Sequence, residues 1–265
     1  MSATSLAFGL PPSMGQEHAA RRARRLEAYL GNVLAREVVV KVAQNYEALE
    51  KDLLSGAVLA AWGPPFVCAR TEAYGGRGLV RGIRDGSATY RSAVIALKSR
   101  KLKLENEGLK AVWVDRDSTA GYLLPQALLR ERGMHGWKTF TEERFAGSYR
   151  VAVEDVLAGR SDLTAVWASG EKVTPATALG ELAGPRANEF EVLAYSRESP
   201  NDGVVLSPKS DDPTAAALER AFLTMHEDAE GLGMLAEVFQ AERFEPAPRG
   251  SYRALYDLVF AALPG

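Results

Sequence analysis

Short apolar runs rich in β-branched residues alternate with amphipathic segments near the start of the chain. VVVKVA (38–43) is followed by YEALEKDLLSG (46–56), in which apolar residues recur at helical spacing before a glycine, and then by AVLAAW (57–62). Strands covered on both faces read as continuous apolar runs, and parallel strands are joined by helices. The spacing therefore predicts a β-α-β unit within an α/β sheet that carries helices on both faces.

The same alternation extends over most of the chain. Strands are predicted at 5–10, 78–83, 89–98, 110–115, 139–142, 162–168 and 189–196, and helices at 18–34, 65–76, 118–132 and 149–157. The rest of the chain is predicted to be mostly helical. A charged stretch, SRKLKLENEGLK (99–110), interrupts the pattern and is predicted to connect two lobes. We therefore expect an α/β fold with two lobes, residues 1–97 plus 194–265 and residues 98–193, joined by two long strands.

Composition excludes several classes of protein. The 265 residues carry a formal net charge of −2, which argues against a nucleic-acid binder. The single cysteine, Cys68, excludes an intramolecular disulfide and is predicted to be a small buried apolar residue. The three histidines are too far apart for a zinc motif, so no metal site and no cofactor are predicted. No apolar run approaches the roughly 18 residues that a membrane span requires.

Enzyme motifs are absent from the sequence. It lacks G-x-S-x-G, a Walker A loop and H-E-x-x-H, and the glycine-rich YGGRGLVRG (74–82) falls between a helix and a strand, the wrong order for a phosphate loop. Asp115, Asp117 and Asp162 follow or precede strands. Asp115 or Asp117 is a candidate general base, and the alternative is that these residues are strand-end or capping carboxylates. We predict no catalytic residues, although a fold alone does not decide function.

The corner VDRDSTAGYLLP (114–125) combines a strand end, two hydroxyls and a helix start. In open α/β sheets, ligands collect at the carboxyl ends of strands, where the next helices begin. The unpaired N–H groups and positive dipole of a helix start, together with Ser118 and Thr119, suit a small oxyanion, and Gly121 permits close backbone approach. The alternative is that Ser118 is only an N-cap. Pro125 is expected to kink the helix or remove a hydrogen bond.

The ordered motifs resemble one family. LLSGAVLAAWGPP, STAGYLLP and FAGSYRVAVEDVLAGRSD are similar to the patterns G-x-x-D-(I/L)-A-x-x-G-P, S-T-S-G-Y-x-x-P and G-S-H-x-x-(A/S) with a following L-x-x-G-x-x-D. These patterns belong to the periplasmic phosphate/phosphonate-binding proteins of ABC importers. The resemblance, which covers residues 5 to 168, implies the two-lobed type 2 periplasmic-binding-protein fold, in which each lobe is a mixed, mainly parallel sheet flanked by helices and the lobes are joined by two hinge strands.

The resemblance also implies a function and a set of ligand-binding residues. The protein would capture a small phosphonate- or phosphate-like oxyanion in a cleft between lobes, which then close by hinge motion. Ser118 and Thr119 would donate to the ligand, with the amides of Ala120 and Gly121 behind them, and Tyr149 would replace the histidine of the family. The opposite lobe would contribute Tyr90, the turn at Gln44, Asn45 and Tyr46, and the loop after Trp62. For the tyrosines the alternative is an ordinary aromatic at a strand end, and for Trp62 it is core packing.

Three positions depart from the family pattern. Ala120 stands in place of a third hydroxyl, and Tyr149 offers only a neutral hydrogen bond where the family has histidine. Ala57 occupies the place of the usual acidic residue of the strand-end motif. A phosphonate dianion would meet fewer partners, because charge-assisted hydrogen bonds are roughly twice as strong as neutral ones. The departures predict either weak affinity or a different ligand.

Two hypotheses follow for the biological role. The first is a monomeric solute-binding protein with an ABC permease as its partner, periplasmic if an export signal has been removed from the sequence. The second is a cytoplasmic sensor or enzyme built on the same scaffold, with a divergent small-molecule ligand. The start, MSATSLAFGLPP, lacks a basic region followed by a sustained apolar stretch, which favours the second location as the sequence stands.

Overall fold

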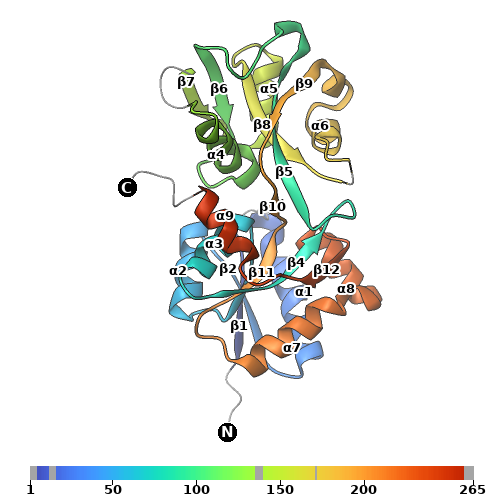
Figure 1. Ribbon diagram of the computed structural model, residues 1–265. Coiled ribbons are helices and arrows are strands. Elements are labelled where there is room, and N and C mark those ends of the chain that lie inside the picture. The colour runs from blue at the N-terminus through green and yellow to red at the C-terminus, as the bar shows by residue number, and fades with distance from the viewer. Residues whose placement is uncertain (1–4, 12–15, 135–139, 171, 260–265) are drawn as a thin grey trace. The chain divides into compact units, whose positions relative to one another are not determined.

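The computed structural model describes residues 5–11, 16–134, 140–170 and 172–259. The chain forms two compact units, each built on its own sheet (Figure 1). Unit 1 contains residues 1–88 and 200–257, and unit 2 contains residues 89–199 together with 258–265. The chain therefore leaves unit 1 after Ala88 and returns to it after Ser199.

Unit 1 begins with the predicted β-α-β pattern and ends with segments from the C-terminal part of the chain. Its elements are β1 (Leu6–Leu10), α1 (Gln16–Leu34), β2 (Val38–Val42), α2 (Tyr46–Ser55), β3 (Ala60–Gly63), α3 (Pro65–Ala73), β4 (Arg77–Ile83), β11 (Gly203–Leu206), α7 (Asp212–Leu223), η6 (Met225–Glu227), α8 (Ala229–Met234), η7 (Leu235–Phe239), β12 (Arg243–Pro246) and α9 (Ser251–Val259).

The sheet of unit 1 has the strand order β12-β4-β11-β3-β1-β2. β1 pairs in parallel with β2 and β3, as the β-α-β pattern predicts. β11 is inserted antiparallel between β3 and β4, and β12 pairs antiparallel with the outer side of β4. Both antiparallel strands come from the later part of the chain, so unit 1 is complete only when its two chain segments meet.

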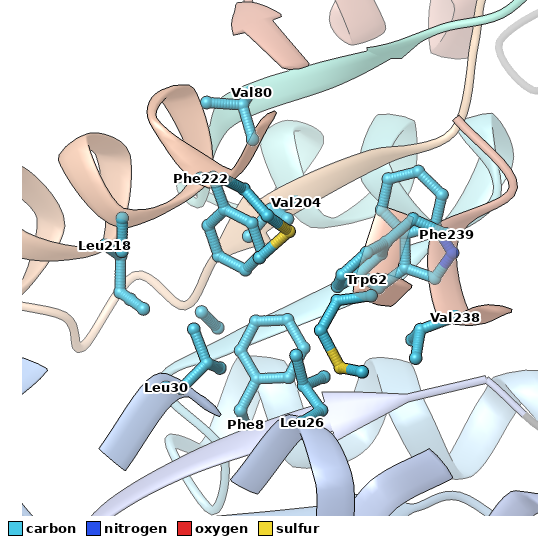
Figure 2. Close-up of a cluster of buried hydrophobic side chains, with 14 of the residues drawn as sticks. Phe8, Leu26, Leu30, Trp62, Val80, Val204, Leu218, Phe222, Val238 and Phe239 are labelled. Atoms are coloured by element: carbon cyan, nitrogen blue, oxygen red, sulfur yellow. The ribbon is translucent and has the colours of Figure 1, made fainter. Parts of the chain in front are cut away.

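An aromatic cluster forms the core on one face of this sheet (Figure 2). The indole of Trp62 meets the rings of Phe239 and Phe244 edge to face at centroid distances of 5.2 and 5.7 Å, and Phe222 packs against both phenylalanines and against Phe8. Such pairs stabilise a core beyond the area that they bury. Trp62 is therefore a core residue, which confirms the core-packing alternative.

The opposite face carries α2, α3 and α9. Cys68 of α3 is fully buried, and burial raises the pKa of its thiol well above the ordinary value, as expected of an apolar-like cysteine. Tyr252 of α9 is also fully buried, and its hydroxyl donates to the Asn201 carbonyl at 2.8 Å. A Cβ added to Gly203 would lie 2.2 Å from this hydroxyl, so only glycine leaves room for the ring.

Unit 2 contains the middle of the chain. Its elements are β5 (Thr89–Leu97), η2 (Lys98–Arg100), β6 (Leu109–Trp113), η3 (Thr119–Leu123), α4 (Leu124–Glu131), β7 (Phe140–Phe145), α5 (Tyr149–Leu157), β8 (Leu163–Ala168), α6 (Ala176–Ala183), η5 (Gly184–Glu189), β9 (Phe190–Tyr195) and β10 (Ser199–Pro200), whose second residue belongs to unit 1.

The sheet of unit 2 runs β10-β5-β8-β6-β7, with β9 paired to β5. β6 is parallel to β7 and β8, whereas β5 is antiparallel to β8 and β9. Successive residues of β5 point to opposite faces, as a strand requires: Ala93 and Ile95 join the core under α5 and α6, while Val94 and Ala96 join the core under α4. Each unit thus has a sheet with a core on both faces.

The structure confirms an α/β fold with two mixed sheets. The strands predicted around residues 5–10, 38–43, 57–62, 78–83, 89–98, 110–115, 162–168 and 189–196 are present, as are the helices at 46–56 and 149–157. The strand predicted at 139–142 is β7, although residue 139 lies outside the described residues. The sheets contain more antiparallel pairing than the mainly parallel pairing that was predicted, because β11 and β12 went unpredicted.

The charged stretch at 99–110 does not connect two lobes. It lies between β5 and β6 inside unit 2, and Leu104 is buried in the same core as Trp113. The passages between units lie instead at residues 88–89 and 199–200, not after residues 97 and 193. β5 and β9 fall within unit 2 because β5 pairs along most of its length with both β8 and β9.

Replacement of Gly203 by alanine should destabilise the protein, because the new Cβ would collide with the Tyr252 hydroxyl and with the Val80 carbonyl oxygen. Overpacking of this kind costs about 1–3 kcal/mol. Gly180 is the matched control, because it lies in the exposed interior of α6 with nothing within 4 Å of an added Cβ. Gly180→Ala should stabilise by about 0.5–1 kcal/mol. Chemical denaturation of both variants checks the opposite signs.

Candidate functional site

The carboxyl ends of β6 and β7 place two turns side by side at one edge of the unit 2 sheet. The strands are parallel, so the turn that leads to Ser118 and the turn that leads to Tyr149 leave the same edge. Two backbone hydrogen bonds join them, from the Ala146 amide to the Trp113 carbonyl and from the Gly147 amide to the Val114 carbonyl, both at 2.8 Å. Sequence-distant residues thereby become neighbours.

The turn after β6 folds because short polar side chains satisfy its backbone. The Asp115 carboxylate accepts from the Asp117 amide at 2.9 Å, and the Asp115 carbonyl accepts from the Ser118 amide at 3.1 Å. Ser118 then acts as the N-cap, and its hydroxyl oxygen accepts from the Gly121 amide at 3.1 Å. Ser118 is therefore an N-cap, its contact with a ligand stays a prediction, and Asp115 is a turn residue.

The helix that starts here is continuous but changes type. Residues 119–123 form a π-helical turn, in which the amide of Leu123 bonds to the Ser118 carbonyl and that of Leu124 to the Thr119 carbonyl; residues 124–131 follow as α-helix. Pro125 has no N–H, so the next bond of the series is missing. A π-turn is a typical way for a helix to absorb such an interruption near a functional site.

Other groups take over the carbonyls that Pro125 leaves unpaired. The Ala120 carbonyl accepts from the Ser92 hydroxyl at 2.6 Å, and the Gly121 carbonyl accepts from the Val114 amide at 3.5 Å. Gly121 is also sterically required, since an added Cβ would lie 2.5 Å from Val114 Cγ2 and 2.7 Å from Ser118 Oγ. The turn is thus held from the sheet side, and its shape does not depend on a ligand.

Three donors of this turn have no partner among the described residues. The amides of Thr119 and Ala120 stand at the start of the helix, where amides have no intrahelical acceptor, and no other acceptor is found for them in that part of the chain. Thr119 is only 6% exposed, and its hydroxyl is buried without a hydrogen bond. An unpaired buried hydroxyl costs free energy, so an acceptor from a ligand would relieve it.

Ser118 and Tyr149 form a hydroxyl pair beside these donors. The two oxygens lie 3.1 Å apart, and either can be the donor. The Tyr149 ring packs edge to face on Trp167 at 5.1 Å, which fixes the direction of its hydroxyl. One of the two hydroxyl hydrogens lies within the pair. The pair therefore consists of two neutral hydroxyls and carries no charge.

Helix α5 holds Tyr149 in place through a cap and an ion cluster. The Ser148 hydroxyl caps α5 by accepting from the Val151 amide at 3.3 Å. Asp155, 3% exposed, accepts from the guanidinium groups of Arg144 of β7 and Arg160. Burial alone would raise the pKa of Asp155, but these two arginines outweigh burial and hold the pKa below its ordinary value of 3.8. The cluster ties α5 to β7.

Tyr90 lies at the start of β5, at the same edge of the unit 2 sheet. β5 is antiparallel to β8, and Arg91 pairs with Ala168, so the beginning of β5 stands beside the carboxyl end of β8. Tyr90 therefore belongs to unit 2 with Ser118, and the expectation that it comes from the opposite lobe is wrong. The reason is that the chain changes units after Ala88, before β5 begins, and not after residue 97 as predicted. Its contact with a ligand stays a prediction.

Tyr46 is the first residue of α2 in unit 1. Asn45 caps this helix, with its side-chain oxygen 2.7 Å from the Ala48 amide, and the Tyr46 ring packs edge to face on Phe66 at 5.1 Å. Both rings stand where α2 and α3 begin after the parallel strands β2 and β3. This is a place where α/β sheets bind ligands. Ala57 precedes β3 and lies at its amino end, so its departure from the family pattern falls at the other edge.

The remaining acidic residues have structural roles. Asp162 accepts from the Lys110 amide at 2.8 Å and pairs with Arg100, so it joins β6 to β8. Within the described residues, no group of three His, Cys, Asp or Glu side chains is placed to hold a metal ion. Sequence reasoning missed Ser92, which appears in TYRSAVIAL only as one polar residue in an apolar strand.

Comparison with known proteins identifies the family. A model of the periplasmic substrate-binding proteins of phosphonate ABC transporters matches residues 8–252. The chain belongs to this family. The solute-binding function predicted from the motifs is thereby confirmed, and the comparisons give no support to the alternative of a cytoplasmic sensor or enzyme. Membership also implies a small-molecule ligand and a permease partner.

Solved structures of similar proteins show the same fold. A Xanthomonas citri protein bound to ATP has a TM-score of 0.82 at 17% identity, covering 97% of this chain and 96% of its own. The binding component of an ABC phosphonate transporter from Pseudomonas aeruginosa has a TM-score of 0.71 at 20% identity, covering 96% and 85%. PhnD1 from Prochlorococcus marinus in complex with methylphosphonate has a TM-score of 0.73 at 17% identity, covering 96% of each chain. The predicted periplasmic-binding-protein fold is confirmed.

Substitution of Gly121 by alanine should disrupt the turn, because the added Cβ would push against Val114 and against the capping hydroxyl of Ser118. We expect a loss of about 1–3 kcal/mol in the free energy of unfolding. Urea denaturation measures this loss. Unchanged stability would mean that the turn relaxes without the Ser118 cap.

The Asp155 cluster should give the protein an acid-sensitive component of stability. Because the pKa of Asp155 is lowered by folding, its contribution is complete above the ordinary value of 3.8 and is lost as pH falls through the lower folded-state value. Asp155→Asn should cost about 1–2 kcal/mol at pH 7. The difference in the free energy of unfolding between this variant and the natural sequence, measured by denaturation, should become smaller as the pH falls from 5 to 3. A constant difference over that range would contradict this assignment.

Proposed function

We propose that this solute-binding protein captures a small phosphonate- or phosphate-like oxyanion at the turn formed by Ser118, Thr119, Ala120 and Gly121, for import by an ABC permease. The observation that carries the proposal is the set of three unpaired donors, the Thr119 and Ala120 amides and the buried Thr119 hydroxyl. Oxyanions are acceptors, and helix starts bind them through such donors. The Gly121 amide is already used by the Ser118 cap, so it supports the turn more than the ligand.

The positive end of the helix attracts an anion, but the hydroxyls around it add no full positive charge. The start of a helix carries roughly half a positive elementary charge, and the hydroxyls of Ser118, Thr119 and Tyr149 beside it are neutral. Tyr149 contributes a neutral hydroxyl through its contact with Ser118. We therefore expect weaker binding of a phosphonate dianion than at a turn that contains a histidine cation. Contributions from Tyr90 and Tyr46, and enclosure of the ligand by both units, stay predictions.

The biological setting follows from the family. Its members are periplasmic substrate-binding proteins, and we infer the same compartment for this chain. Among the described residues, none of the helices has both the length and the apolar character needed to cross a bilayer. A permease partner is expected to recognise the ligand-bound form, because a ligand shifts a conformational equilibrium by its difference in affinity for the two states.

The substitution Thr119→Val tests the assignment with effects of opposite sign. Removal of a buried hydroxyl that has no partner should leave the free energy of unfolding unchanged or raise it by up to about 1 kcal/mol. The same change should weaken methylphosphonate binding by about tenfold or more, since it removes a donor to the ligand. Titration calorimetry with methylphosphonate, aminoethylphosphonate, phosphate and sulfate measures the binding, and denaturation measures the stability.

Thr164→Val provides a matched control. Thr164 of β8 is also fully buried in unit 2 with an unpaired hydroxyl, but it lies inside the sheet at the position paired with Ile95. This variant should resemble Thr119→Val in stability and the natural sequence in binding. Equal binding by both variants would remove Thr119 from the site. Failure of all four anions to bind the natural sequence at millimolar concentration would overturn the oxyanion proposal.

A further inference from the structure

Ser92 lies at the meeting point of β5, β9 and the oxyanion turn. It is fully buried, and its hydroxyl donates to the Ala120 carbonyl at 2.6 Å. This is a contact between residues 28 positions apart in sequence, and it joins β5, the strand that pairs with β9, to the helix start. Neither the family pattern nor the hydroxyl-rich motif at 118–125 includes this residue.

The need for the Ser92 hydroxyl arises from Pro125. In the π-turn, amides bond to carbonyls five residues earlier, and the amide that would serve Ala120 is the one that proline lacks. A buried carbonyl without a donor is costly, and Ser92 supplies the missing hydrogen from the neighbouring strand. The Ser92 hydroxyl therefore replaces the backbone donor that is missing at Pro125.

Ser196 holds Ser92 from the other side. The Ser196 amide donates to the Ser92 carbonyl at 2.9 Å, and the Ser196 hydroxyl accepts from the Ser92 amide at 2.9 Å and donates to the Arg197 carbonyl at 2.7 Å. Both serines lie within a few residues of the passages between units, after Ala88 and after Ser199. One short network thus links Ser92 and Ser196 to the carbonyl of Ala120, whose amide belongs to the unpaired donors.

We propose that Ser92 is a positioning residue for ligand binding. It holds the Ala120 peptide so that the amides at the helix start face the ligand, and it connects that peptide to Ser196 at the end of β9. The inference rests on the proposed oxyanion function for its consequence in affinity. The positioning itself is a property of the ligand-free protein and is measured separately.

The first measurement is amide hydrogen exchange of the ligand-free protein. Ser92→Ala should increase the exchange of the Tyr122 and Leu123 amides by about tenfold, because both donate to the Ser118 carbonyl within the turn that Ser92 supports. The second is titration with methylphosphonate at a temperature where each variant is fully folded, where the Kd should rise by about tenfold. Ser92→Thr, which keeps the hydroxyl, should restore both values.

Ser207→Ala is the matched control for loss of a buried serine. Ser207 lies in unit 1, where its hydroxyl accepts from the Lys209 amide at 3.1 Å. It should lower stability without changing the exchange of the Tyr122 and Leu123 amides or the Kd. An effect of Ser92→Ala confined to global stability, with turn exchange and Kd equal to those of this control, would overturn the positioning role.

A double-mutant cycle tests the link between Ser92 and Pro125. Pro125→Ala restores an N–H that can reach the Ala120 carbonyl, so the added effect of Ser92→Ala on turn exchange should be smaller in this background. Equal effects in both backgrounds would show that the hydroxyl does not replace the proline donor. If the natural sequence binds none of the anions while turn exchange responds as expected, the proposed function fails and the positioning of the turn by Ser92 stands.

Discussion

The structure of the candidate site depends on one missing backbone donor. Pro125 interrupts the hydrogen-bond series of a helix whose first turn carries the unpaired amides of Thr119 and Ala120. The π-turn absorbs the interruption, and the Ser92 hydroxyl and the Val114 amide satisfy the carbonyls that remain. The turn is held by the sheet behind it, and the amides of Thr119 and Ala120 and the Thr119 hydroxyl remain without acceptors among the described residues. This arrangement is prepared for a ligand before any ligand arrives, which reduces the ordering cost of binding.

Part of this site could be predicted from the sequence. The motif STAGYLLP predicts the helix start, because hydroxyl residues, glycine and proline each have a typical role near the beginning of a helix. Tyr149 could be predicted as a site residue only from the resemblance to the family. Its contact with Ser118 depends on the parallel pairing of β6 and β7, which the local sequence does not show. Ser92 was not predictable, because a single serine in an apolar strand gives no local signal about a carbonyl 28 residues away. Tyr90 was assigned to the wrong unit because the residues before β5, where the chain changes units, carry no local signal of that change.

The fold was predictable to a similar degree. The segments that form β1, β2 and β3 predict parallel strands, because they are apolar throughout and separated by helices. The antiparallel strand β11 was missed: GVVL is only four residues long, and its place between β3 and β4 is set by tertiary contacts. The charged stretch before β6 was misinterpreted as a connector because its exposed lysines and glutamates outnumber the buried Leu104 that anchors it.

The central position of β11 has a consequence for how the chain acquires its structure during synthesis. β3 and β4 have no strand between them until residue 206 has been synthesised. Until then, the edges of β3 and β4 that later pair with β11 remain unpaired. Unit 2 is encoded almost entirely by the uninterrupted segment 89–199 and meets no such delay. The unit that begins second along the chain is therefore the first whose sheet can be completed as the polypeptide emerges.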